Sequence, residues 1–372
     1  MLWPVVKPPN SSMYWLDEIH KSFYIKLFDG RDFDDCFPTE FNAVLTASLK
    51  TKGCFNSVYE DYHLLTDAHK ASFRQVYEQQ VNLADAYSDT LIVLLKPNIK
   101  RPNTIEHKEL WGSCKKLGEC LYATTLGLRC FTGALSTRFN TLLLADMSSH
   151  YQEFKRLNSG ICSFCGLLPL AAEVLIDPTD EHEIQLRASY DHYLPKAKYP
   201  FLAVDFDGLV PCCDTCNEDF KKHEDVLEIE EERSLAFTPY SQEQVRLIAD
   251  YSRSDGDFYQ MLVKIEETGC VLELKGKTWD KAFKVTGRAN KLLKDCFSEE
   301  WLAPLLADVD NVEEAKRKLL RESIKFIARR KLSKEAYYKE LIFRYLSNSA
   351  DEVVENLITT VQAIYAPRVG LL

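Results

Sequence analysis

The sequence has no long hydrophobic run, no internal repeat and no low-complexity tract. A membrane-spanning helix needs about 18 consecutive apolar residues, and TLIVLLKP at 90–97, among the most apolar stretches, is far shorter. The first ten residues, MLWPVVKPPN, lack the charged start, long apolar core and small-residue cleavage site of a secretory signal. We therefore expect a cytoplasmic protein with no membrane segment.

Positively charged residues are outnumbered by negatively charged ones. The sequence has 46 Lys and Arg residues and 56 Asp and Glu residues, which gives a net charge of −10. Proteins that coat nucleic acid non-specifically rely on local positive charge, so the balance counts against that class. It remains compatible with a nuclease that has a basic strip at one site, or with one that a protein partner delivers to its substrate.

The 372 residues are too many for one compact core of ordinary size and predict two or three domains. Apolar residues recur every three or four positions over 73–87, 107–131 and 312–346, which predicts helices. Between 158 and 222 this period is lost, and Gly, Cys, Pro and aromatic residues crowd together. The expected fold class is α+β: a helical N-terminal region over 1–157, a small central module over 158–230 and a mostly helical C-terminal region over 231–372.

Two stretches of the C-terminal region carry further expectations. GCVLELKG at 269–276 predicts a strand edge or a hairpin arm. The helical stretch 312–346 is rich in Lys and Arg, and its basic face could contact nucleic acid. The interspersed Glu residues favour an ordinary salt-bridged surface instead. Its apolar residues on or near one face are Leu319, Leu320, Ile324, Ile327 and Ala328.

Four of the twelve cysteines form two C-x-x-C pairs, Cys162 with Cys165 and Cys213 with Cys216. In a reducing compartment, close cysteine pairs are interpreted first as metal ligands, and this spacing lets two thiolates bind one tetrahedral zinc ion. Cys212 is an alternative to Cys213, but Cys213 stands three residues before Cys216. Four sulfur ligands leave no open position for water, so the predicted Zn²⁺ stabilises the fold and does no chemistry.

Polar residues of a second kind lie between and just after these pairs. The stretch YDHYLPKAKYP at 190–200 sets Asp191 beside His192 and continues to Lys196, and Asn217 and Lys221 follow Cys216. An Asp-His step alone is usually a surface turn, Asn217 alone could be a polar residue at a helix start, and Lys221 could lie on a solvated helix face. Their position relative to the two cysteine pairs favours a functional site.

This order of residues resembles the HNH endonuclease family, in the subgroup whose ββα-metal core is held by a four-cysteine zinc site. The resemblance covers about residues 160–223. It implies that Asp191 and Asn217 ligate a catalytic Mg²⁺ or Mn²⁺ ion and that His192 is the general base. It also implies that two lysines lie near the phosphate of the substrate, Lys196 and Lys221.

The sequence departs from the family at one position. Gly208 precedes Leu209 where the family usually has Asn, a residue that helps to orient the histidine, and the neighbouring Asp207 is a candidate substitute. The remaining donors suit the chemistry, because carboxylate and amide oxygens bind hard divalent cations. A neutral imidazole can accept a proton from water at physiological pH.

The leading hypothesis is therefore a divalent-metal-dependent HNH endonuclease that hydrolyses phosphodiester bonds in DNA, with RNA as a second possible substrate. The resemblance also implies a setting in bacterial antiviral defence, with a protein partner or a homo-oligomer controlling the nuclease. The alternative is a catalytically inactive zinc-stabilised interaction module in a nucleic-acid-related complex. A redox role for the C-x-x-C pairs is disfavoured, because the βαβ pattern that usually accompanies it is missing.

Overall fold

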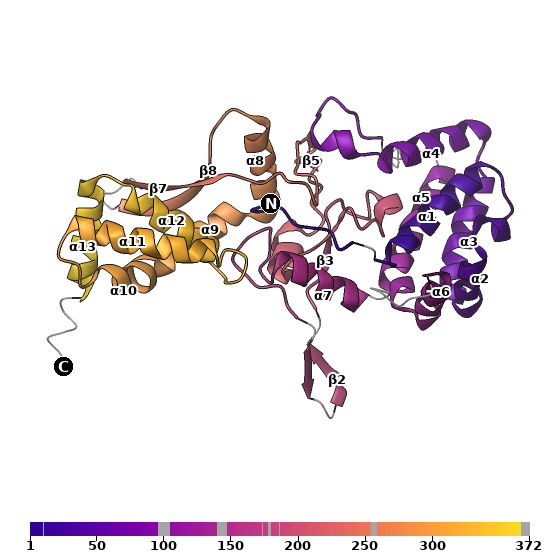
Figure 1. Cartoon of the computed structure of the whole chain (residues 1–372). Coiled ribbons are helices and arrows are strands. Elements are labelled where there is room, and N and C mark those ends of the chain that lie inside the picture. The colour runs from indigo at the N-terminus through magenta and orange to yellow at the C-terminus, as the bar shows by residue number, and fades with distance from the viewer. Residues whose placement is uncertain are drawn as a thin grey trace.

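The protein is mostly helical and elongated in the computed structural model, which describes residues 1–9, 11–95, 105–139, 147–172, 174–177, 180–185, 187–253 and 259–365. One group of helices occupies each end, and the short strand β3 (Tyr190–His192) lies between them (Figure 1). The breaker-rich stretch 97–104 lies outside the described residues. Among the described helices, none combines the length and the apolar character needed to cross a membrane.

The N-terminal helices pack around an aromatic core. Trp15 stacks on Phe131 with their ring centroids 5.9 Å apart, and Phe23 meets Phe55 edge to face at 4.9 Å. Such aromatic pairs add to the free energy of area burial. The helical elements are α1 (Tyr14–Phe28), η1 (Phe33–Cys36), α2 (Thr39–Ala47), α3 (Leu49–His63), α4 (Asp67–Gln80), η2 (Ala84–Tyr87), α5 (Ile105–Ala123), η3 (Thr125–Gly127), α6 (Arg129–Phe139) and α7 (Met147–Asn158).

The described strands pair in two-stranded antiparallel sheets, β1 with β2, β3 with β4, β5 with β6 and β7 with β8. Two short helical segments, η4 and η5, flank β4 in the central part of the chain. The elements are β1 (Val174–Asp177), β2 (Asp180–Gln185), β3 (Tyr190–His192), η4 (Pro200–Leu202), β4 (Leu209–Pro211), η5 (Thr215–Lys221), β5 (Glu228–Ile229), β6 (Glu232–Arg233), β7 (Leu247–Arg253) and β8 (Tyr259–Ile265).

The C-terminal helices follow the β7–β8 hairpin and pack against it. Asn290 holds the hairpin from the side, because its amide accepts from the backbone N–H of Val263 at 2.7 Å and donates to the carbonyl of Val263 at 3.1 Å. The helices are α8 (Val271–Phe283), α9 (Val285–Cys296), η6 (Phe297–Leu302), α10 (Ala303–Leu306), α11 (Val312–Ile327), α12 (Ala336–Ser347) and α13 (Asp351–Tyr365).

The strand or hairpin arm expected at 269–276 is wrong, because helix α8 begins at Val271 within this stretch. The carboxylate of Glu273 accepts hydrogen bonds from the backbone N–H groups of Thr268 and Gly269, both at 2.7 Å, which satisfies donors just before the helix. Gly276 then packs against Ile265 of the hairpin. The alternation of apolar residues resembled a strand, but the helix continues to a buried face that contains Trp279 and Phe283.

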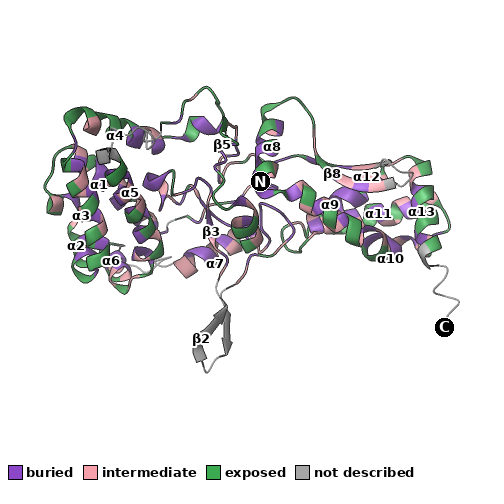
Figure 2. Cartoon of the chain, turned by 180° about the vertical axis from the view of Figure 1, so that it is seen from behind, coloured by how far each residue is buried: buried purple, intermediate pink, exposed green. Residues whose placement is uncertain are grey.

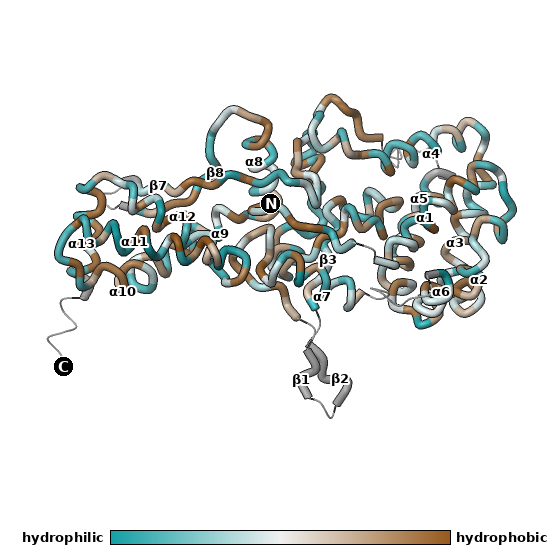
Figure 3. The backbone as a smooth tube through the Cα atoms, viewed as in Figure 1, coloured by the Kyte–Doolittle hydropathy of each residue, from teal (hydrophilic) through white to brown (hydrophobic). Residues whose placement is uncertain are grey.

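The expected helical stretches are present, with shorter bounds. The 73–87 stretch falls in α4 and η2, and 312–346 divides into α11 and α12. The apolar face of α11 is only partly covered, since Leu319 is buried whereas Leu320, Ile324 and Ile327 are exposed. Figure 3 shows hydrophobic and hydrophilic residues alternating along the helices at both ends.

The segment between β3 and β4 is anchored in the N-terminal helices. Phe201 of η4 is fully buried, and its ring lies edge to face with Tyr24, at 4.8 Å between centroids, and with Trp111, at 5.6 Å. Helix α5 approaches this segment at Gly118, where a Cβ atom would lie 2.7 Å from the Cβ of Ala203. Buried residues accordingly continue from the helical ends through the centre of the chain (Figure 2).

Candidate functional site

The hairpin of β3 and β4 carries the residues singled out in the sequence. Tyr190 pairs with Pro211, Asp191 with Val210 and His192 with Leu209, and the helical segment η5 follows the second strand. Successive side chains of a strand point to opposite faces, so Asp191 and His192 project to different sides. The two sides have different surroundings.

The four cysteines of the two C-x-x-C pairs come together in one buried cluster, and their sulfur atoms all lie within 4.8 Å of one another. The Sγ atoms of Cys162 and Cys216 are 3.9 Å apart, and those of Cys165 and Cys213 are 3.8 Å apart. Four convergent thiols match the donor set of a closed tetrahedral site. The cluster could therefore hold a metal ion such as zinc, and the choice of Cys213 over Cys212 agrees with the geometry.

Groups from distant parts of the chain surround the cluster. Arg288 of α9 donates a hydrogen bond from Nη1 to the Sγ of Cys216 at 3.2 Å. Tyr338 of α12 donates to the carbonyl of Cys165 at 2.7 Å, and the backbone N–H of Leu2 donates to the carbonyl of Ser163 at 2.9 Å. A divalent ion with four thiolates carries a net negative charge, so the guanidinium of Arg288 would offset part of it.

Asp191 is nearly inaccessible to solvent and forms an ion pair with Lys221, which is also fully buried. The Nζ of Lys221 lies 3.0 Å from Oδ1 of Asp191 and donates to the carbonyl of His192 at 2.7 Å. Burial raises the pKa of Asp191, and the neighbouring ammonium opposes that shift. The second carboxylate oxygen, Oδ2, is buried and has no hydrogen-bond partner among the described residues.

His192 lies on the other side of the strand and is partly buried. Its Nε2 is 3.0 Å from the carbonyl oxygen of Ala203. A carbonyl only accepts hydrogen bonds, so Nε2 carries the proton and Nδ1 keeps its lone pair. Burial lowers the pKa of His192 to about 3, with smaller contributions from Lys196 and Lys221. The imidazole is therefore neutral near pH 7.

Lys196 shares an aromatic neighbour with His192. The Nζ of Lys196 lies 5.2 Å from the centroid of the Tyr122 ring, and the Tyr122 and His192 rings meet edge to face at 4.5 Å. Lys196 is half-buried. Lys221, in contrast, contacts the hairpin and not solvent, so the expectation that it contacts phosphate finds no support in its placement.

A cavity of about 440 Å³ lies beside His192. Asp205, Asp207 and Lys21 also line it. Each carboxylate has a lysine partner, because Lys21 lies 3.7 Å from Asp205 and Lys7 lies 2.6 Å from Asp207. Asp207 is therefore engaged elsewhere, and the idea that it replaces the Asn of the family receives no support. Gly208, which occupies that Asn position, lines the same cavity.

Asn217 lies on η5, whose π-type turn is closed by a hydrogen bond from the N–H of Lys222 to the carbonyl of Asn217. Residues four and five apart fall on one face of such a turn, so Asn217 lies on the face of Lys221, the partner of Asp191. Within the described part of the chain, the side-chain amide of Asn217 makes no hydrogen bond. The amide is therefore available as a donor or acceptor.

Sequence reasoning missed several contributors to this arrangement. Tyr122 and Ala203 contact His192, and Arg288 contacts the cysteine cluster. Arg288 stands 72 positions after Cys216 in the chain, so no local spacing could have indicated it. The approach of Gly118 to Ala203 has a signal in the sequence only in that glycine, which has no Cβ, permits close contact with another segment.

No protein-family model, no curated protein and no solved structure matches this chain.

Proposed function

We propose that this protein is a divalent-metal-dependent HNH endonuclease that hydrolyses phosphodiester bonds, with DNA as the expected substrate and RNA as a second candidate. The observation that carries the proposal is the arrangement around the β3–β4 hairpin. Asp191 and His192 share one strand, the paired strand leads to Asn217, and the four-cysteine cluster joins the two flanking segments. This is the order of elements expected of a ββα-metal core.

The donors on the hairpin fit a hard cation. The Oδ2 atom of Asp191 is buried without a partner, which is costly unless a cation or a hydrogen-bond donor satisfies it. The amide of Asn217, on the same helical face as Lys221, is the second proposed ligand. A bound Mg²⁺ or Mn²⁺ ion would supply charge neutralisation at the phosphate and at the leaving oxygen.

His192 has the proton state that a general base needs. Its Nε2 proton is directed to the carbonyl of Ala203, so Nδ1 can accept a proton from an attacking water molecule. Lys196 would attract the phosphate beside it, while Tyr122 holds the positions of both side chains. Lys221 acts in this scheme as a positioning residue, because it joins the helical segment to both residues of the strand.

The second candidate is an interaction module without cleavage. Two observations favour it: the ion pair that already occupies Oδ1 of Asp191, and the glycine at the position of the family's Asn. A scaffold alone has no need for a neutral histidine, a carboxylate with an unsatisfied oxygen and an available Asn on one hairpin and the helical segment after it, so we favour the nuclease.

Plasmid cleavage tests the proposal. We expect purified protein, alone or with proteins encoded beside its gene, to nick or cut DNA when Mg²⁺ or Mn²⁺ is added. His192→Ala should abolish the activity while zinc content and thermal unfolding stay normal, and His223→Ala, at an exposed histidine, should leave it unchanged. Cleavage that survives His192→Ala would refute the assignment. The absence of cleavage of DNA and RNA with every divalent ion would favour the interaction module.

A further inference from the structure

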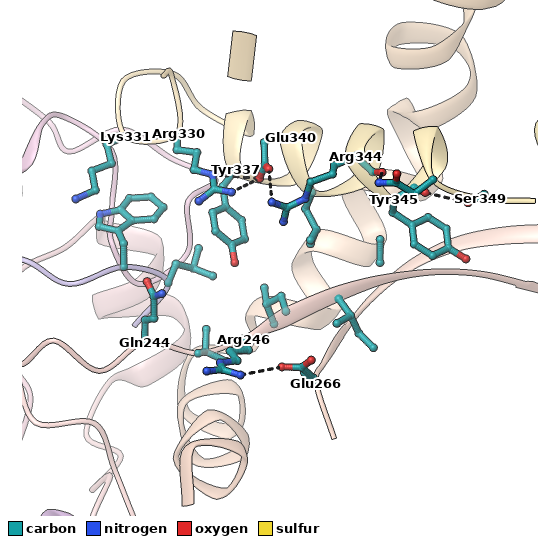
Figure 4. Close-up of a pocket in the computed structure, with 18 of the residues that line it drawn as sticks. Gln244, Arg246, Glu266, Arg330, Lys331, Tyr337, Glu340, Arg344, Tyr345 and Ser349 are labelled. Atoms are coloured by element: carbon teal, nitrogen blue, oxygen red, sulfur yellow. Dashed lines mark hydrogen bonds and ion pairs between the residues drawn. The ribbon is translucent and has the colours of Figure 1, made fainter. Parts of the chain in front are cut away.

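A groove lies far along the chain from the hairpin, between helix α12 and strand β7, with the N-terminal segment at one side. Its volume is about 1060 Å³. Figure 4 shows Arg330, Tyr337, Glu340 and Arg344 on one wall and Gln244, Arg246 and Glu266 on the other. Pockets for small molecules usually measure about 300–1,000 Å³, so this α12–β7 groove has room for a segment of a polymer.

The groove is positively charged although the protein is acidic. Four cationic side chains line it against two carboxylates, an excess of two positive charges. The chain as a whole has a net charge of −10, so the local balance is opposite to the overall one. The cations are Arg246, Arg330, Lys331 and Arg344.

A buried carboxylate fixes two of these cations. Glu340 is 1% exposed, and Arg330 binds its Oε2 from both Nε and Nη2. On the other side, Nη1 of Arg344 lies 3.2 Å from Oε1. The side chains of Arg330 and Arg344 remain 34% and 51% exposed. Each guanidinium has five N–H donors, so both keep donors for a ligand after binding Glu340.

Aromatic and apolar side chains line the same groove. Tyr337 and Tyr345, two turns apart on α12, are half-buried, whereas Trp3, 6.1 Å from Tyr337 between ring centroids, is buried behind it. The run from Tyr337 to Arg344 covers about 10 Å of helix. Aromatic faces beside arginines are the combination that binds single strands, because bases stack on the rings while the cations meet the phosphates.

We propose that the α12–β7 groove binds a segment of single-stranded nucleic acid. An acidic peptide would use the cations but has no planar bases for the aromatic rings, so the groove fits it less well. The groove is connected to the cysteine cluster through α12: Tyr337 lines the groove, and the adjacent Tyr338 binds the carbonyl of Cys165. A strand held there would lie beside the metal-binding part of the protein.

The neighbouring α11 surface serves as the comparison. Lys318 pairs with Glu314 and Lys325 with Glu322, which fits the ordinary salt-bridged surface that was one of the two interpretations of this segment. Arg317 and Arg321 are exposed on the same helix and do not line the groove. Replacing both arginines by neutral residues removes two positive charges, as many as a double substitution of cations in the groove removes.

The experiment measures fluorescence anisotropy of a labelled ten-nucleotide oligo(dT) and of oligo(U), in the full-length His192→Ala background and without added Mg²⁺ or Mn²⁺. Binding is then read without cleavage, so this proposal and the proposed nuclease activity can fail separately. We expect Lys331→Gln/Arg344→Gln to weaken binding at least tenfold and to reduce the salt dependence by about 0.7 for each lost phosphate contact. Arg317→Gln/Arg321→Gln should bind within twofold of the parent.

Two further comparisons separate nucleic acid from other anions. Tyr337→Leu should weaken binding of the oligonucleotide about tenfold, because one stacking face is lost, and should have little effect on an abasic strand of equal length. Zinc content and thermal unfolding of each variant serve as the folding controls. Equal loss of binding in the groove and α11 double variants, competition by polyglutamate as strong as that by unlabelled oligonucleotide, or no binding at 50 mM salt would overturn the proposal.

Discussion

Lys221 and Asp191 form a buried ion pair, with Nζ 3.0 Å from Oδ1 and both side chains almost fully removed from solvent. The same ammonium donates to the carbonyl of His192. One lysine of the helical segment therefore fixes two consecutive residues of the strand, which makes it a structural connection within the candidate site. The resemblance had implied a lysine near the phosphate, and the alternative was a lysine on a solvated helix face.

Removal of this lysine should strongly destabilise the protein. Lys221→Met leaves a buried carboxylate without its partner, and such changes cost about 3–5 kcal/mol. Urea unfolding measures the loss. The matched control is Lys222→Met at the next, exposed residue, which should change stability by less than about 0.5 kcal/mol. Equal effects of the two substitutions would contradict the pairing.

Metal content should depend on Cys213 and not on its neighbour. We expect the wild-type protein to contain one zinc ion per chain, and Cys213→Ala to lose it together with much of its stability, since structural zinc contributes folding free energy directly. Cys212→Ala, at a buried thiol outside the cluster, should keep the zinc. Elemental analysis measures the zinc content, and thermal unfolding measures the stability of each variant. Zinc loss from Cys212→Ala alone would show that the ligand set is wrong.

Gly118 should be intolerant of even a methyl group. In Gly118→Ala the new Cβ meets the Cβ of Ala203 at 2.7 Å and the carbonyl of Pro200 at 3.1 Å. Overpacking of this kind costs about 1–3 kcal/mol, and it would shift the residue whose carbonyl holds Nε2 of His192. We expect lower stability and, if the protein is a nuclease, a loss of cleavage.

Gly112→Ala provides the control for that experiment on the same helix. No atom lies within 4 Å of a Cβ added at Gly112, so the better helix propensity of Ala should stabilise the protein by about 0.5–1 kcal/mol. Opposite signs for the two glycines are expected in chemical denaturation. A neutral or stabilising Gly118→Ala would mean that α5 does not approach the segment as closely as described.

Gly208 should accept the residue that the HNH family usually has there. A Cβ at this position lies 3.7 Å from the carbonyl oxygen of Asp205, an ordinary contact, and the position has no left-handed backbone conformation. On the proposed function, Gly208→Asn should raise the cleavage rate, because the amide can hold the histidine. Gly208→Ala should not. A folded Gly208→Asn protein that cleaves no faster would argue against the role taken from the resemblance.

His20 should make the protein sensitive to acid. This buried histidine on α1 has no hydrogen-bond partner at either ring nitrogen among the described residues, and burial lowers its pKa to about 3. Between about pH 6.5 and pH 3, His20 is protonated in the unfolded chain but not in the native chain. The free energy of unfolding therefore falls as pH falls, by about 1.4 kcal/mol per pH unit.

The measurement is the difference in unfolding free energy between pH 7 and pH 5. His20→Leu should reduce that difference by about 2 kcal/mol, because pH 5 lies about 1.5 units below the pKa of an unfolded histidine. His223→Gln, at an exposed histidine, should leave the difference as it is. An unchanged pH dependence in His20→Leu would show that the native imidazole is protonated as readily as the unfolded one.

Local patterns were sufficient for much of the molecule. The three-to-four spacing of apolar residues predicted helices that correspond to α4, α5, α11 and α12, since a helix face repeats at that interval. The C-x-x-C spacing predicted which four thiols converge, because each pair lies within a single turn. The start of α8 was mistaken for a strand. Eight residues are too few to distinguish an alternating strand pattern from the first turns of a helix, and the large buried residues of α8 come later in the sequence.

The sequence by itself determined the helical character, the two C-x-x-C pairs and the adjacency of Asp191 and His192, because these depend on residues close together in the chain. Only the tertiary structure decided what those side chains contact. In the structure, Lys221 is a buried ion-pair partner of Asp191, and Nε2 of His192 contacts the carbonyl of Ala203. Arg288 donates a hydrogen bond to Cys216, 72 positions earlier in the chain. Burial and charge pairing depend on which distant segments pack together, and no local pattern carries that information.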